Sequence, residues 1–149
     1  ARIGAADRAA WGLPRKGGLT LPEAPEALAA RLRATELRPG ALLVARTTTD
    51  PKNTEAHCEA LLVERLGQEP CDALVGLAPV LLYSFLCPCP ACAEKIAAFA
   101  RARPGLRLEL AFERAFIPAE AARFRGGVSD ASSLAAMRAA GVAICQLGD

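Results

Sequence analysis

Apolar residues along the chain fall into two spacings, one typical of helices and one typical of strands. Leu28 and Leu32 lie four positions apart, on one face of a helix, whereas Leu106, Leu108 and Leu110 alternate with polar residues as in a strand. The predicted helices cover about residues 22–36, 54–66, 89–103 and 130–140, and the predicted strands cover about residues 41–46, 80–86, 106–111 and 142–147. This alternating order predicts an α/β fold, with one sheet and helices on its faces.

The connection between the last two predicted strands indicates how they pair. It runs from Phe116 to Val142 and contains the last predicted helix. A hairpin needs only a few residues, whereas a parallel pair needs a crossover of about this length. We therefore expect the last two strands to be parallel, with the helix as a right-handed crossover.

Local signals fix where the helices begin and end. Thr54 is the expected N-cap of the second helix, which places His57 and Glu59 in its first turn, and Gly67 is its expected stop. Gly141 is the expected stop of the last helix.

Composition indicates a single folded domain. The chain has 149 residues, 52% of them hydrophobic, and a net charge of +2, so it differs from disordered chains and from strongly basic nucleic-acid binders. No apolar run approaches the roughly twenty residues that span a bilayer, so no membrane partner is expected. Residues 1–21, rich in Gly, Pro and Arg, predict an irregular N-terminal arm before a domain over residues 22–149.

Two short motifs carry the chemistry: His57-Cys58-Glu59 and Pro88-Cys89-Pro90-Ala91-Cys92. Cys89 and Cys92 are three positions apart at a helix start, so both thiols share one face. His57 supplies a nitrogen ligand from another helix start. Zinc takes such ligands tetrahedrally, and a catalytic site keeps three protein ligands with one open position. We therefore expect His57, Cys89 and Cys92 to bind Zn²⁺.

Glu59 is the expected catalytic residue. It lies two positions after His57, roughly 200° around the helix, so it can face the open coordination position without being a ligand. There it can take a proton from zinc-bound water, whose pKa falls to about 7, and pass it to the ring nitrogen and the leaving ammonia. The paired signature H-x-E…P-C-x-x-C is typical of zinc nucleobase deaminases.

The alternative is a structural zinc site with four protein ligands. Cys58 or Cys87 would supply the fourth ligand, and the protein would then be a catalytically silent binding protein. This alternative leaves Glu59 without a role.

With these motifs, residues 22–149 resemble the AID/APOBEC-like branch of the cytidine deaminase superfamily. Leu86-Cys87-Pro88-Cys89 stands where that family usually has Trp-Ser-Pro-Cys. The resemblance implies a cytidine-deaminase-like fold with a central mixed sheet flanked by helices, and its parallel last strands distinguish this branch from the free-nucleoside cytidine deaminases. It also implies substrate contacts for Phe116, whose family counterpart stacks on the target base, and for Asn53.

The expected reaction is hydrolytic deamination of cytosine to uracil. The substrate would be single-stranded DNA or RNA, since a paired base is hidden in the stack, or a smaller cytidine compound. The motif by itself also allows adenine as the base. The small size and the start at Ala1, without an initiator Met, resemble the secreted novel AID/APOBEC-like deaminases and predict a processed form.

Four cysteines remain outside the predicted metal site: Cys58, Cys71, Cys87 and Cys145. Their even number allows two disulfides in three possible pairings. Cys71 lies past the far end of the second helix from Cys58, and Cys145 in mid-strand is typical of a buried thiol. Cysteine usage therefore permits an extracellular location without requiring one.

Overall fold

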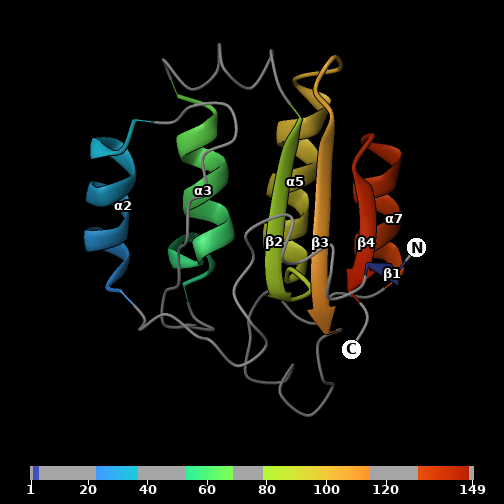
Figure 1. Cartoon of the computed structure of the whole chain (residues 1–149), viewed down its shortest axis with the longest axis horizontal. Coiled ribbons are helices and arrows are strands. Elements are labelled where there is room, and N and C mark those ends of the chain that lie inside the picture. The colour runs from blue at the N-terminus through green and yellow to red at the C-terminus, as the bar shows by residue number, and fades with distance from the viewer. Residues whose placement is uncertain (1, 4–22, 37–52, 69–78, 115–130, 148–149) are drawn as a thin grey trace.

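A parallel sheet forms the centre of the computed structural model, which describes residues 2–3, 23–36, 53–68, 79–114 and 131–147. The strands lie in the order β1 (Arg2–Ile3), β4 (Ala143–Leu147), β3 (Leu108–Arg114) and β2 (Val80–Leu86) (Figure 1). Every pair of neighbouring strands in this part of the chain is parallel. The α/β class is confirmed, while the antiparallel pairs that a mixed sheet requires do not occur among the described residues.

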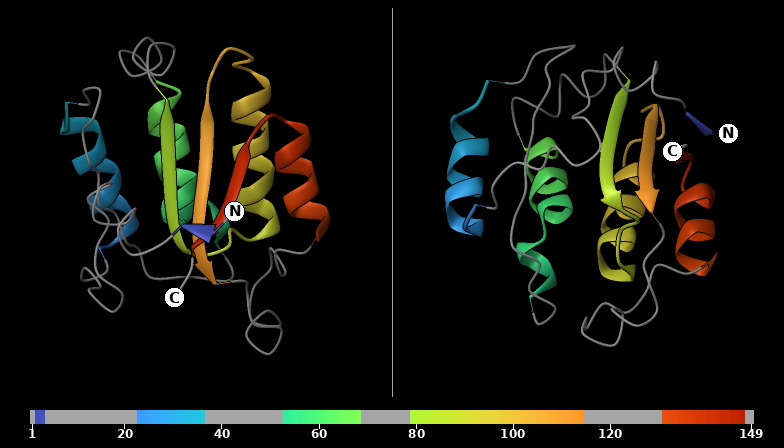
Figure 2. Two further views of the ribbon diagram at one scale, coloured as in Figure 1. Left: turned by 45° about the vertical axis from the view of Figure 1, so that its right-hand side comes forward. Right: turned by 60° about the horizontal axis from the view of Figure 1, so that its bottom comes forward.

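Two helices make the crossovers between these strands. α5 (Pro90–Arg101) connects β2 to β3, and α7 (Ala131–Ala139) lies between β3 and β4. Both lie on the same face of the sheet (Figure 2). The prediction that the last two strands pair in parallel around a crossover helix is therefore confirmed.

Alternate residues of each strand face opposite sides of the sheet, as the period of two requires. One row faces the helices and joins the main core, and the next row faces the other way. The two rows are Leu82, Leu110 and Ile144 on the helix face, and Tyr83, Ala111 and Cys145 on the opposite face. The helices complete the main core with Val63, Ala93, Ile96, Ala97, Phe99, Ala100 and Met137.

α7 ends at a glycine in the left-handed conformation. Gly141 has φ of 93°, its N–H donates to the Arg138 carbonyl oxygen at 3.0 Å, and the Val142 N–H donates to that of Met137 at 3.0 Å. Met137 and Val142 are both buried, which completes the hydrophobic contact of a Schellman motif. The predicted stop at Gly141 is confirmed.

The start of the second predicted helix differs from the expectation. Thr54–Ala56 form a 3₁₀ turn, η1, and the α-helix α3 covers Cys58–Leu66 with His57 as its N-cap, so the prediction of Thr54 as N-cap is wrong. The Asn53 carbonyl accepts the Ala56 N–H at 3.2 Å, so the tighter turn uses the backbone groups there, and His57 has extended backbone angles.

The N-terminal part of the chain contributes one short strand to the sheet. β1 pairs with β4 and was not anticipated by the sequence, while the rest of the predicted arm and the predicted strand at residues 41–46 lie outside the described residues. None of the described helices is long and apolar enough to cross a membrane.

A buried arginine joins α3 to the outermost helix, α2 (Pro25–Ala34). Arg65 is 8% exposed, and its Nε donates to the Leu32 carbonyl oxygen at 2.7 Å. Its guanidinium also donates to the Thr35 carbonyl oxygen at 3.5 Å. These two carbonyls lie at the last turn of α2, so Arg65 satisfies groups that the helix itself leaves unpaired.

Replacing Arg65 with alanine should lower the free energy of unfolding by about 2 kcal/mol, because hydrogen bonds to a charged group contribute about 1.5–3 kcal/mol. Urea denaturation measures this change. Arg33→Ala, at an exposed position of α2, is the matched control and should change stability by less than about 0.5 kcal/mol. Equal losses in the two variants would contradict the role assigned to Arg65.

Candidate metal centre

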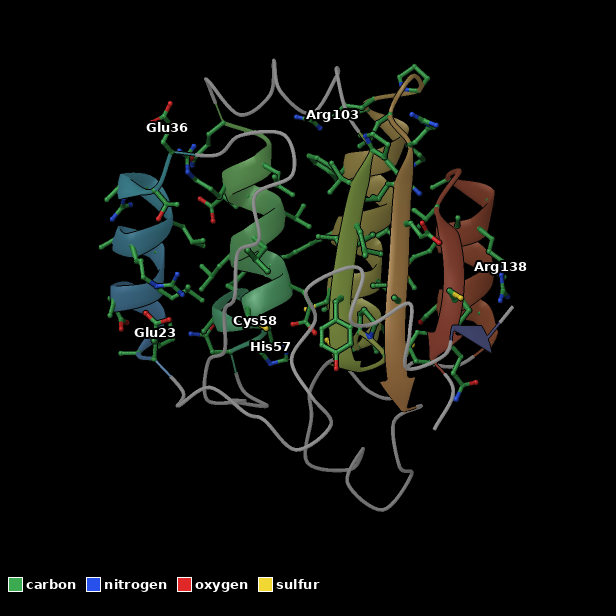
Figure 3. The ribbon with its side chains drawn as sticks, viewed as in Figure 1. Glu23, Glu36, His57, Cys58, Arg103 and Arg138 are labelled. Carbon is green, nitrogen blue, oxygen red and sulfur yellow. The ribbon has the colours of Figure 1, made fainter. Side chains whose placement is uncertain are left out.

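Two helix N-termini converge at the carboxyl end of the strands. His57 is the N-cap of α3 and Cys89 is the N-cap of α5, which begins directly after β2. His57 and Cys58 lie at the end of α3 toward which the strand arrows point (Figure 3). Ligands of open α/β sheets bind at this edge, so the fold places the motif residues where a site is expected.

Three ligand atoms meet there. The Nδ1 atom of His57 lies 3.7 Å from Sγ of Cys89 and 3.5 Å from Sγ of Cys92, and all three ligand atoms are within 4.8 Å of one another. Zinc bonds of about 2.3 Å to sulfur and about 2.0–2.1 Å to nitrogen, at tetrahedral angles, put N and S about 3.6 Å apart. The observed spacing thus matches a tetrahedral zinc site.

The three side chains of the cluster are almost fully buried. His57, Cys89 and Cys92 are 6%, 5% and 1% exposed. Ala60 and Ala91 pack beside the cysteines. Two thiols and an imidazole buried together need partners for their polar atoms, and they are a donor set that zinc prefers.

The two thiols are strongly coupled. A hydrogen bond from the Cys92 thiol lowers the pKa of Cys89 to about 4, and the same interaction raises the pKa of Cys92. This interaction favours a state in which one of the two cysteines is a thiolate and the other keeps its proton. Zinc binds the thiolate form of cysteine, so a bound cation would take the place of the remaining proton.

The helix starts favour negative charge at this point. Neither His57 nor Cys89 uses its side chain to cap its own helix, and Pro90 occupies the first turn of α5, where a missing N–H has no cost. Backbone bonds to the His57 and Cys89 carbonyls, from Leu61 N at 3.1 Å and Ala93 N at 2.8 Å, begin the two helices. The positive ends of both helix dipoles lie beside the thiolates.

Glu59 lies beside the cluster but outside the group of ligands. It is half-buried, and its charge contributes to raising the pKa of Cys92. Its Oε1 accepts a hydrogen bond from the Ser84 hydroxyl at 3.1 Å, and its Oε2 accepts one from the Cys58 thiol at 3.4 Å. The carboxylate therefore has a defined place next to the metal ligands.

Ser84 was not identified from the sequence, although a signal existed. Ser84 lies an even number of positions from Val80 and Leu82 along β2, so all three are on the strand face that points to the helices. Ser84 is thus a polar residue on an apolar face. A partly buried hydroxyl on an apolar face needs a hydrogen-bond partner, and Glu59 is that partner here.

The candidate fourth ligands do not join the cluster. Among the residues that the structure describes, the only group of ligand atoms within metal-binding distance is that of His57, Cys89 and Cys92. Cys58 directs its thiol to Glu59, and Cys87 is buried but lies outside this group. Cys58, Cys87 and Cys145 carry thiols rather than disulfides, and Cys71 lies outside the described residues.

The predicted substrate contacts stay predictions. Asn53 is exposed and directly precedes η1, on the segment that leads to His57. Phe116 lies outside the described residues, and nothing is described of the side chain of Leu86.

Two arginines at the C-terminal end of α5 have protein partners. The Arg103 guanidinium stacks on the Phe99 ring at 4.1 Å, and Arg101 donates to Glu94 at 2.6 Å. Arg103 also lies at the end of the molecule opposite His57 (Figure 3). These contacts favour a structural role for Arg101 and Arg103 over a nucleic-acid surface.

Comparisons of the chain with known protein families, with curated proteins and with solved structures found no match.

The purified chain should bind one zinc ion per molecule, because three buried ligand atoms have the spacing of a tetrahedral site. Plasma mass spectrometry measures the ratio. Cys92→Ala should lose stoichiometric zinc, whereas Cys145→Ala, which removes a buried thiol on the opposite side of the sheet, should keep it. Full zinc content in Cys92→Ala would contradict the site.

Zinc should also stabilise the fold, because its ligands come from α3 and α5 and the unfolded chain lacks the preformed site. Free zinc at one hundred times its Kd should raise the free energy of unfolding by about 2.7 kcal/mol. Thermal unfolding with zinc or with a chelator tests this, with Cys92→Ala as the control that should show no difference. An unchanged Tm in the parent protein would contradict it.

Proposed function

We propose that this chain is a zinc-dependent deaminase of the AID/APOBEC-like type that hydrolyses cytosine to uracil. The observation that carries the proposal is the cluster of His57, Cys89 and Cys92 with the Glu59 carboxylate beside it. Three ligands and a separate acid–base group are the parts that a catalytic zinc site needs, whereas a structural site closes its metal with four ligands.

The reaction replaces an amino group with an oxygen. Water adds to the ring carbon that bears the amino group, and ammonia leaves, so one water is consumed and no oxidant is needed. When bound, zinc would lower the pKa of a coordinated water to about 7 and so supply the nucleophile at neutral pH.

Glu59 moves the protons in this proposal. Its carboxylate takes a proton from the attacking water and delivers it to the ring nitrogen next to the reacting carbon. A further proton transfer to the amino group lets it leave as ammonia. Burial of the ligands and the half-buried position of Glu59 keep these transfers out of bulk water.

Two observations support the proposed AID/APOBEC-like family. The motifs H-x-E and P-C-x-x-C occur in order at two helix starts, and the last two strands pair in parallel. We therefore propose a cytidine-deaminase-like fold and, as substrates, cytosine in single-stranded DNA or RNA or a small cytidine compound. Asn53 and Phe116 are the proposed substrate contacts.

Zinc-loaded protein should convert cytosine to uracil in at least one of three substrates: cytidine, single-stranded DNA and single-stranded RNA. Mass spectrometry of the products measures the conversion. A duplex of the same sequence should react far more slowly, because its bases are paired and stacked. Absence of uracil from all three, with one zinc bound, would overturn the proposal and favour a silent binding protein with a structural zinc.

Glu59→Ala should keep its zinc and lose turnover by at least about a hundredfold, because positioned acid–base groups contribute about 10²–10⁴ in rate. Glu64→Ala is the matched control, since it removes an exposed glutamate from the same helix. Zinc content and the rate of uracil formation are measured for both. A Glu59→Ala protein that turns over like Glu64→Ala would show that another group moves the protons.

A further inference from the structure

We infer that Ser84 is a positioning residue that sets the orientation of the Glu59 carboxylate. The inference rests on the proposed function, because the carboxylate needs a fixed orientation only if it transfers protons. Its starting point is the hydrogen bond from Ser84 Oγ to Glu59 Oε1 at 3.1 Å, which joins β2 to the first turn of α3.

The glutamate side chain does not fix its own carboxylate plane. The last torsion of glutamate is broad and roughly two-fold, so the two oxygens can turn with little cost. A proton-transfer group must nevertheless hold one oxygen toward its substrate, since a displacement of about 1 Å can cost about a hundredfold in rate. Some outside donor must therefore define the plane.

Two donors hold Glu59, one on each oxygen. The Cys58 thiol reaches Oε2 at 3.4 Å, and the Ser84 hydroxyl reaches Oε1. A thiol is a weak hydrogen-bond donor, whereas a hydroxyl is a stronger one. Ser84 is thus the stronger of the two constraints, and Oε2 is the oxygen held more loosely.

This asymmetry assigns different tasks to the two oxygens. A hydroxyl has one proton to donate, so the bond to Oε1 uses the donor capacity of Ser84. Oε1 is then the anchored oxygen, and Oε2 is the oxygen that can exchange its weak donor for a proton in transit. Ser84 touches no reacting atom in this scheme and acts through Glu59.

The position of Ser84 in the strand makes the anchor rigid. Val80 and Leu82, on the same face of β2, pack against the main core, and β2 pairs with β3 along its length. Ser84 itself pairs with Phe112 of β3, which is 5% exposed. The hydroxyl therefore comes from a backbone that the sheet holds in place, which a loop residue would not offer.

The test compares Ser84→Ala with Ser84→Thr, which keeps the hydroxyl and suits a strand. Ser132→Ala, at an exposed position of α7, is the matched control for removal of a serine hydroxyl. In Ser84→Ala we expect kcat to fall about ten- to a hundredfold, with little change in KM and one zinc still bound. Ser84→Thr should recover most of the lost kcat, and Ser132→Ala should match the parent protein.

A second measurement does not depend on activity. Infrared spectra of the zinc-loaded protein report the hydrogen bonds to the Glu59 carboxylate oxygens. The difference between the spectra of the parent protein and Glu59→Gln assigns the bands of this carboxylate. These bands should shift in Ser84→Ala and return toward their original positions in Ser84→Thr.

The outcomes separate this inference from the proposed function. Unshifted bands, or a Ser84→Ala protein as fast as Ser132→Ala, would overturn the positioning role while leaving deaminase activity intact. Loss of zinc in Ser84→Ala, or a threonine variant as slow as the alanine variant, would show a packing role instead. A parent protein without activity on any substrate would overturn the proposed function and the positioning role together.

Discussion

Two thiols and an imidazole buried at one point form the constraint around which this domain is organised. Polar groups removed from water need partners, and a buried thiolate needs a compensating charge. Here the compensation comes from the hydrogen bond between the cysteines, from two helix N-termini and, when present, from a divalent cation. The cluster therefore requires that α3 and α5 begin at the same place. The parallel sheet positions the start of α5, because this crossover helix begins directly after β2.

Each half of the site supplies at least one candidate metal ligand and one group with a role in the proposed proton transfer. The start of α3 carries His57 and Glu59, while the passage from β2 to α5 carries Ser84, Cys89 and Cys92. Contacts cross between the halves twice, from His57 to the cysteines and from Glu59 to Ser84. Metal binding and carboxylate placement are consequently coupled, since a shift of α3 relative to β2 would disturb both.

The sequence predicted this arrangement where the signal is local. The elements from residue 80 onward follow from apolar alternation, from prolines and glycines at their ends and from the length of the last crossover, and the ligand set follows from motif spacing. The N-cap of α3 was predicted at Thr54 instead of His57 because a 3₁₀ turn and an α-helix can begin with the same kind of residue. Only the backbone geometry distinguishes the two. Ser84 was missed because its partner is 25 positions away, and no short motif encodes a contact between a strand and a helix.

The same distinction explains why the candidate metal ligands are easier to infer than the group that orients the carboxylate. A metal requires several ligands of limited chemical types, so it leaves a recognisable pattern of His and Cys at helix starts. An orienting hydrogen bond requires only one donor at the correct place, which serine, threonine or a backbone N–H could supply. In this chain Ser84 provides that donor from a rigid strand, on the strand face that points to the helices. It is this conjunction, rather than its residue type, that makes it the structural support of Glu59.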